Sequence, residues 1–221
     1  IDSKSLVKSG TLQSIENEIL QNLLYKATSA ETGSQETTTK ESATFAPLSY
    51  AQTGVYFDCL KNPLSTIYNI PCLLTYPEGT DAHKLAKAVG QVISCHPEMS
   101  VYFEAQENGI IQSIASDLSI EIPVCTMSDD ELAAYKKDFV RPFNLQKAPL
   151  YRFEVVQTPQ AVHLLMDVHH LIFDGGSVDL FIRQISDVLE EKGVEPETYT
   201  FLDFVHDQQE AENTEVFQKA E

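Results

Sequence analysis

The spacing of apolar residues along the chain changes between helical periodicity and short strand-like runs. Apolar side chains recur every three or four residues in 81–95 and again in 178–189, which predicts two amphipathic helices. Short apolar runs bounded by turn-forming residues predict strands at 100–106, 109–114, 150–157 and 161–168. Strands and helices mixed in this order favour an α/β fold with a mixed sheet.

Local signals sharpen some of these boundaries. Ser128 is followed three residues later by Glu131, a capping-box pattern that predicts the start of a helix. Glu107, Asn108 and Gly109 are turn formers between two predicted strands. Gly193 follows the second amphipathic segment, and we expect it to end that helix.

The first 44 residues differ from the rest of the chain. Residues 1–26 contain a helical pattern that Thr11 can cap. In residues 27–44, half of the side chains are Ser or Thr and none is large and apolar, which indicates a flexible linker. We therefore expect a domain boundary here, with the main domain covering residues 45–221.

Composition excludes several classes of function. The net charge is −18, whereas nucleic acids and anionic membranes attract clustered Lys and Arg. No stretch approaches the ~20 apolar residues of a membrane span, and the N-terminus lacks a secretory pattern. We therefore expect a cytoplasmic protein with neither kind of partner. Because the sequence does not begin with Met, we also expect it to be a fragment of a longer chain.

The four cysteines form no C-x-x-C pair and have no His at zinc-ligand spacing. This pattern predicts free thiols and no metal site. The cysteines are Cys59, Cys72, Cys95 and Cys125.

The most informative segment is His169-His170-Leu-Ile-Phe-Asp174-Gly175, between an apolar strand and an amphipathic helix. Successive strand residues point to opposite faces, so only one of the two imidazoles can face a given cleft. The Asp-Gly pair predicts a tight turn that brings a carboxylate near the histidines. A lone His or a lone Asp-Gly is more often structural, but the composite pattern is far more specific than its parts.

That segment resembles the core signature of nonribosomal peptide synthetase condensation domains, which belong to the chloramphenicol-acetyltransferase-like superfamily. Other segments resemble motifs of the same family in the same order, and the likeness covers residues 45–221. These segments are Pro47–Gln52, Tyr68–Pro71, Arg141–Leu145, Ala148–Arg152 and Phe201–Phe204.

The resemblance implies a two-layer α/β sandwich with a mixed sheet, forming one half of a two-lobed domain whose site lies between the halves. It places His170, His169 and Asp174 in the catalytic site. His170 would face the substrate tunnel as a base or as a group that positions the amine, while His169 and Asp174 would maintain the architecture and Gly175 the turn. Arg152, on the neighbouring predicted strand, is one candidate partner for Asp174, and an arginine of the other half is another.

The implied reaction joins a carrier-bound donor thioester to a carrier-bound acceptor amine through an amide bond. Both groups would arrive on phosphopantetheine arms, with no cofactor bound directly. The expected partners are upstream and downstream peptidyl carrier domains and the C-terminal half of the condensation domain. Residues 2–19 resemble the last helix of a carrier domain, but the Gly-x-x-Ser segment that accepts the arm is absent.

Three alternatives stay open at this stage: a free-standing acyltransferase, a half-domain that is inactive alone, and a scaffolding domain without activity. Epimerising relatives follow the signature with Ser-Trp, and this chain has no Trp. Heterocyclising relatives replace the paired histidines with aspartates. One departure from the family pattern Arg-His-x-x-Leu-Arg stands at Cys95–Ser100, which keeps His96 but lacks both arginines.

Overall fold

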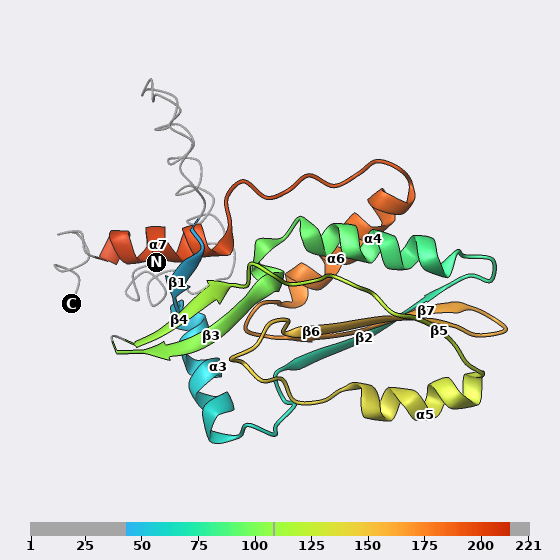
Figure 1. The fold of residues 1–221 in the computed structure, drawn as a ribbon, viewed down its shortest axis with the longest axis horizontal. Coiled ribbons are helices and arrows are strands. Elements are labelled where there is room, and N and C mark those ends of the chain that lie inside the picture. The colour runs from blue at the N-terminus through green and yellow to red at the C-terminus, as the bar shows by residue number, and fades with distance from the viewer. Residues whose placement is uncertain (1–42, 108, 213–221) are drawn as a thin grey trace, which may run out of the picture. The chain divides into compact units, whose positions relative to one another are not determined.

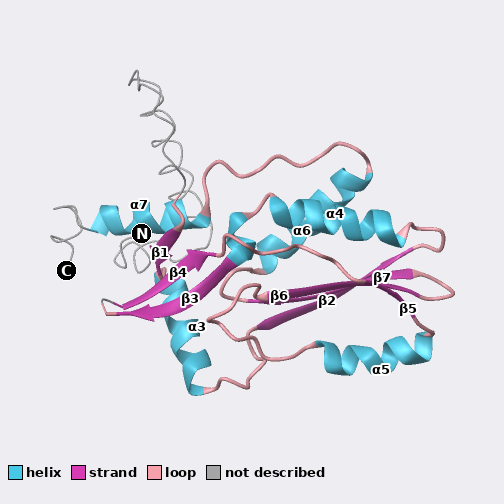
Figure 2. Ribbon diagram, in the orientation of Figure 1, coloured by secondary structure: helices cyan, strands magenta, loops and turns pink. Residues whose placement is uncertain are grey.

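A computed structural model describes residues 43–107 and 109–212. The segment 1–26 and residues 27–42 of the predicted linker lie outside this range. Helices and strands are interspersed along the described chain (Figures 1 and 2). In chain order they are β1 (Phe45–Pro47), α3 (Tyr50–Lys61), β2 (Asn69–Tyr76), α4 (Ala82–Ser94), the short 3-10 helix η1 (Pro97–Ser100), β3 (Val101–Gln106), β4 (Gly109–Ile114), β5 (Val124–Thr126), α5 (Asp129–Phe139), β6 (Tyr151–Gln157), β7 (Val162–His169), α6 (Gly175–Leu189) and α7 (Phe201–Glu212).

The larger sheet has four strands in the order β2-β7-β6-β5. The β2–β7 and β6–β7 pairs are antiparallel, whereas β5 runs parallel to β6. The predicted mixed sheet is therefore confirmed. In the β6–β7 hairpin Tyr151 lies opposite Val168 and Arg152 lies opposite Asp167.

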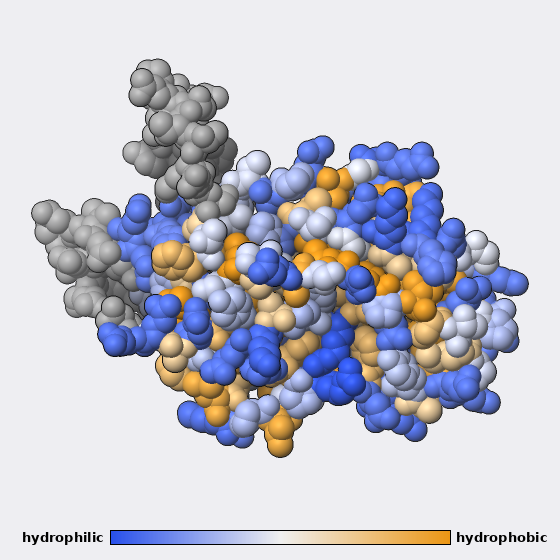
Figure 3. Space-filling view, viewed as in Figure 1, coloured by the Kyte–Doolittle hydropathy of each residue, from blue (hydrophilic) through white to orange (hydrophobic). Residues whose placement is uncertain are grey.

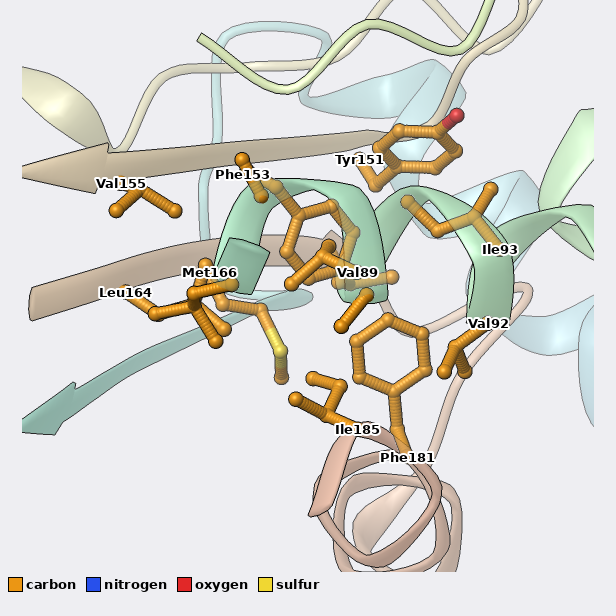
Figure 4. Close-up of a cluster of buried hydrophobic side chains, with 14 of the residues drawn as sticks. Val89, Val92, Ile93, Tyr151, Phe153, Val155, Leu164, Met166, Phe181 and Ile185 are labelled. Atoms are coloured by element: carbon orange, nitrogen blue, oxygen red, sulfur yellow. The ribbon is translucent and has the colours of Figure 1, made fainter. Parts of the chain in front are cut away.

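Helices cover both faces of this sheet, with α4 and α6 on one face and α5 on the other (Figure 1). Alternation along β6 accounts for the arrangement, because Val155 packs toward α4 and α6 whereas Val156 packs with the apolar side chains of α5. The core under α4 and α6 is the larger one, and rings of Phe153 and Phe181 stack in it at a centroid distance of 5.2 Å (Figure 4).

The second sheet has three strands in the order β1-β4-β3. Its own core combines side chains from these strands with α3, α7 and the loop after β7. The buried members include Tyr56, Phe103, Leu171 and Leu202. Residues 171–173 link the two cores, since Leu171 is buried in this one, Phe173 in the larger one, and Ile172 packs against both. The loop that follows His170 is thus anchored on two sides.

Most predicted boundaries hold to within one or two residues. Ser128 caps α5 through a complete capping box, and the strand predicted at 109–114 is present with those bounds. Gly193 does not end α6, contrary to the prediction. That helix stops at Leu189, and the chain turns away at Glu191, whose φ of 63° is left-handed.

Figure 3 shows one face of the molecule, with hydrophilic side chains around the periphery and apolar ones gathered toward the middle. Within residues 43–107 and 109–212, no helix combines the length and apolar character needed to cross a bilayer. All four cysteines lie in the described part of the chain and are free thiols, as predicted.

Candidate active site around His170

The two histidines of the signature occupy opposite environments, as strand alternation predicts. His169 is the last residue of β7 and is buried. Its Nδ1 accepts a hydrogen bond of 3.1 Å from the backbone N–H of Leu171. Burial lowers the pKa of His169 to about 4, and the neighbouring charge of His170 acts in the same direction. His169 is therefore neutral near pH 7, with its proton on Nε2.

The proton on Nε2 of His169 points toward the Cys59 sulfur, 3.7 Å away. Burial raises the pKa of the Cys59 thiol. A neutral thiol beside a neutral, weakly basic imidazole is not an activated nucleophile. This pair is consequently part of the packing beneath the site rather than a second reactive centre.

His170 is exposed and lines a cavity of about 390 Å³. Its backbone N–H donates to the carbonyl of Tyr68 at 2.8 Å, which fixes the peptide while the side chain faces the cavity. The other lining residues come from α3 and its N-cap, η1, β3, β4, the loop that follows β7, α6 and α7. They are Ser49, Ala51, Gln52, Val55, Glu98, Val101, Gln112, Leu171, Ile172, Phe173, Asp174, Ser177 and Phe201.

Two buried glutamines hold the loop that carries His170. Gln52 Nε2 donates to the carbonyl of Leu171 at 2.9 Å and to Gln112 Oε1 at 3.0 Å. Gln112 Nε2 in turn donates to the carbonyl of Pro47 at 2.8 Å. The backbone N–H of Ser49 donates to Gln52 Oε1, completing the cap of α3. Sequence reasoning singled out the segment that contains Gln52 but did not predict this role.

Asp174 caps α6. Its Oδ1 accepts hydrogen bonds from the backbone N–H of Ser177 at 2.8 Å and from the Ser177 hydroxyl at 2.7 Å. The backbone hydrogen bond from Ser177 is the main reason that the pKa of Asp174 is lowered. Gly175, predicted as a turn residue, is the first residue of the helix.

The predicted pairing of Arg152 with Asp174 is wrong. Arg152 Nη1 instead donates to Asp167 Oδ2 at 2.6 Å, across the β6–β7 hairpin, and Asn69 Nδ2 donates to the same carboxylate at 2.9 Å. The Asp167 side chain is completely buried, so it needed both partners, whereas Asp174 is exposed and satisfied by its helix. An arginine from another half of the domain stays a prediction for Asp174.

Arg152 also supports the histidine pair indirectly. Its guanidinium carbon lies 3.8 Å from the centroid of the Phe143 ring. The edge-on contact between Phe143 and His169 has a centroid distance of 5.9 Å. A cation stacked on an aromatic ring restrains that ring, and Phe143 in turn packs against the buried imidazole. The predicted structural role of Arg152 thus has a different geometry from the one expected.

A second polar cluster surrounds His96. His96 Nδ1 lies 2.9 Å from Glu197 Oε1 and 3.4 Å from Glu98 Oε1, and His96 Nε2 lies 2.6 Å from Gln184 Oε1. The hydrogen bond with Glu98 and the further contacts with Gln184 and Glu197 outweigh burial and raise the pKa of His96 to about 9. The imidazole is therefore cationic near pH 7. Both of its ring nitrogens then carry a proton, and neither has a lone pair free for a metal ion.

This cluster lines a smaller cavity, of about 100 Å³, that shares Glu98, Ile172, Phe173 and Ser177 with the larger one. Sequence reasoning noted His96 but missed its partners, because Glu197 is 101 residues away along the chain. No local pattern marks a contact of that separation.

A family model described as the condensation domain matches residues 42–221. Bacitracin synthase 3 of Bacillus licheniformis is 30% identical over 168 residues, covering 76% of this chain and 3% of that protein. Surfactin synthase subunit 1 of Bacillus subtilis (strain 168) is 27% identical over 176 residues, covering 79% and 5%. The chain thus spans only a small part of these synthetases.

Solved structures share the fold. The starter condensation domain of rhizomide synthetase RzmA superposes with a TM-score of 0.66 at 22% identity, covering 78% of this chain and 45% of that one. The first condensation domain of the calcium-dependent antibiotic synthetase, in complex with a substrate analogue, gives 0.66 at 16% identity and covers 80% and 46%. In both cases the chain covers less than half of the matched structure.

Proposed function

The chain belongs to the condensation-domain family, and from this premise we propose that it supplies the histidine-bearing half of an amide-forming site. In that reaction the amine of a carrier-bound acceptor attacks a carrier-bound donor thioester. The observation that carries the proposal is the position of His170, which lines the 390 Å³ cavity beside a buried, neutral His169.

His170 acts on the acceptor amine. An attacking amine must be neutral and must lose a proton as the amide forms. An imidazole within hydrogen-bond reach can accept that proton or orient the amine. The pantetheine arms deliver both reactants at high effective concentration, so positioning supplies part of the rate. His169 holds the loop through Leu171, and Asp174 fixes the first turn of α6 next to it. Neither of them needs to touch substrate.

The proposed partners are a second lobe, which closes the cavity from the other side, and peptidyl carrier domains that bring phosphopantetheine-bound substrates. The matched condensation structures are more than twice as long as the part that this chain covers, which supports a second lobe. We expect the isolated chain to be inactive for the same reason, and the longer synthetase to work in the cytoplasm.

Two other functions would give different results in an assay of amide formation. A free-standing acyltransferase would accept a soluble thioester as readily as a carrier-bound one. A scaffolding domain would form no amide at all, although the intact signature favours activity. Rates measured side by side with carrier-bound and soluble donors separate these cases.

The experiment compares His170→Ala with His83→Ala in the longer synthetase. His83 is an exposed histidine of α4 that lines neither cavity, so its replacement is a matched control. We expect His170→Ala to lower amide formation on two loaded carriers by about 10²-fold, as loss of acid–base help does. Melting temperatures should match the parent in both variants. Product formation by His170→Ala at the parent rate would reject the assignment.

A further inference from the structure

The start of β2 is fastened to the end of β7 by one side-chain amide. Asn69 Nδ2 donates to both carboxylate oxygens of Asp167, at 3.0 Å to Oδ1 and 2.9 Å to Oδ2, and to the carbonyl of Arg141 at 3.0 Å. The Asp167 side chain is completely buried. Hydrogen bonds to a buried charge are among the strong ones in proteins, because water cannot replace them. The first residue of β2 is therefore held more firmly than a fraying strand end.

This anchored residue directly follows the group that holds the backbone of His170. The carbonyl of Tyr68 accepts the N–H of His170 at 2.8 Å. Asn69 lies opposite His169, the last residue of β7, so this hydrogen bond extends the β2–β7 ladder one step beyond the strand. A shift of Asn69 therefore moves the Tyr68 carbonyl, and with it the peptide that carries the His170 imidazole.

We propose that Asn69 is a positioning residue for His170, which it holds in place through the carbonyl of Tyr68. This inference rests on the proposed function, because it takes His170 as the group that acts on the acceptor amine. Asn69 is not among the described residues that line either cavity, and its amide donates to Asp167 and Arg141. It acts on the reaction only by fixing geometry, and small displacements of a catalytic group are costly.

Site-resolved hydrogen exchange of this chain tests the link without requiring catalysis. The probe is the backbone amide of His170, whose exchange reports the opening of its hydrogen bond to Tyr68. Asn69→Ala removes the donor. Asn69→Asp keeps the shape of the side chain but replaces the donor with a second carboxylate beside Asp167. Asn62→Ala, which truncates an exposed amide at the end of α3, is the matched control.

We expect the His170 amide to exchange about tenfold faster in Asn69→Ala, since a hydrogen bond to a charged group is lost. Exchange should be faster still in Asn69→Asp, because two carboxylates then lie side by side. Asn69→Asp combined with Asp167→Asn, which interchanges the amide and the carboxylate, should restore slow exchange. Asn62→Ala should exchange at the parent rate.

A second amide shows whether the effect is local. The N–H of Thr158 donates to the carbonyl of Ala161 at the far end of the β6–β7 hairpin, and its exchange should stay at the parent rate in every variant. Three results would each overturn the proposal: parent-like exchange of His170 in Asn69→Ala, equal acceleration at Thr158, or fast exchange of His170 in the interchanged pair.

A second arm measures amide formation by the longer synthetase with two loaded carriers. A misplaced imidazole withdraws help from the transition state but leaves carrier binding intact. Asn69→Ala should therefore lower the maximal rate by about tenfold and leave the half-saturating carrier concentration unchanged. Val156→Ala, which loosens the core under α5, is the stability control, and it should lower the melting temperature without slowing amide formation.

The two arms separate this inference from the proposed function. If the parent synthetase forms no amide, the proposed function fails, and hydrogen exchange still decides whether Asn69 holds the His170 peptide. If Asn69→Ala forms amides at the parent rate, the function stands and the positioning role is rejected. An equal loss of rate in Val156→Ala would also reject it, because general loss of stability would then explain both variants.

Discussion

Replacing Asp174 with Ala should weaken the fold by the amount that one helix cap contributes. The side chain is exposed, and it accepts hydrogen bonds from Ser177, at 2.8 Å from the backbone N–H and 2.7 Å from the hydroxyl. Loss of such an N-cap costs about 1 kcal/mol, within a range of about 0.5–2. A buried ion pair would instead cost about 3–5 kcal/mol when one partner is removed. The size of the loss therefore distinguishes the two roles.

Thermal unfolding of this chain measures the effect. For a protein of this size, 1 kcal/mol shifts the melting temperature by about 2–4 °C. Asp174→Asn is the control, because Asn caps helices about as well as Asp and should restore most of the loss. Adding Arg152→Ala to Asp174→Ala should give an additive change, since the two side chains do not pair.

The pH dependence gives an independent check. The folded-state pKa of Asp174 is lowered, so its ionised form adds stability above the unfolded pKa of about 3.9, and this share is lost as pH falls through the folded pKa. The gap between the parent and Asp174→Ala should shrink below pH 4. A loss above about 3 kcal/mol at pH 7, or strong coupling to Arg152, would refute the capping account.

Three further predictions follow from the other polar contacts. The folded-state pKa of His96 is about 9, above the ordinary 6.5, so its protonation adds on the order of 3 kcal/mol to the free energy of unfolding below pH 6.5, and this share is lost as pH rises through 9. Denaturant unfolding between pH 6 and 10 should show this loss of stability in the parent and not in His96→Gln. Arg152→Met should lower the free energy of unfolding by about 3–5 kcal/mol, because the buried Asp167 carboxylate loses its cation. Arg152→Met combined with Asp167→Leu should lower it by less than the single change. Urea midpoints that rank the two variants the other way would contradict this. Gln52→Leu should cost about 1–3 kcal/mol in the same assay because the carbonyl of Leu171 loses its donor, and an unchanged midpoint would show that this hydrogen bond does not hold the loop.

Parts of the fold with strong periodicity were predictable. The helix at 81–95 presents a continuous apolar stripe, and the structure has α4 there with Asp81 as its cap. α3 was not predicted as a helix, because only Gln52 and Tyr56 of its side chains are buried and its apolar residues form no clear stripe. Strands as short as β1 and β5 carry too few residues for a period of two to show.

The site was predictable where it depends on strand geometry. Adjacent residues at the end of a strand must face opposite ways, and His169 and His170 do so. The true partner of Arg152 was also within reach of the sequence, since counting back from the turn at 158–161 places Asp167 directly opposite. The cluster of His96, Glu98 and Glu197 was not, because distant segments meet there only after the domain has packed.

The loop of residues 171–173 has a consequence for how this half-domain tolerates change. Its three consecutive side chains are divided between two hydrophobic cores that otherwise belong to separate sheets. A mutation that repacks either core should therefore shift the peptide next to His170, even when the altered residue lies far from the cavity. Grafting this segment onto a foreign scaffold would require both cores to be carried with it.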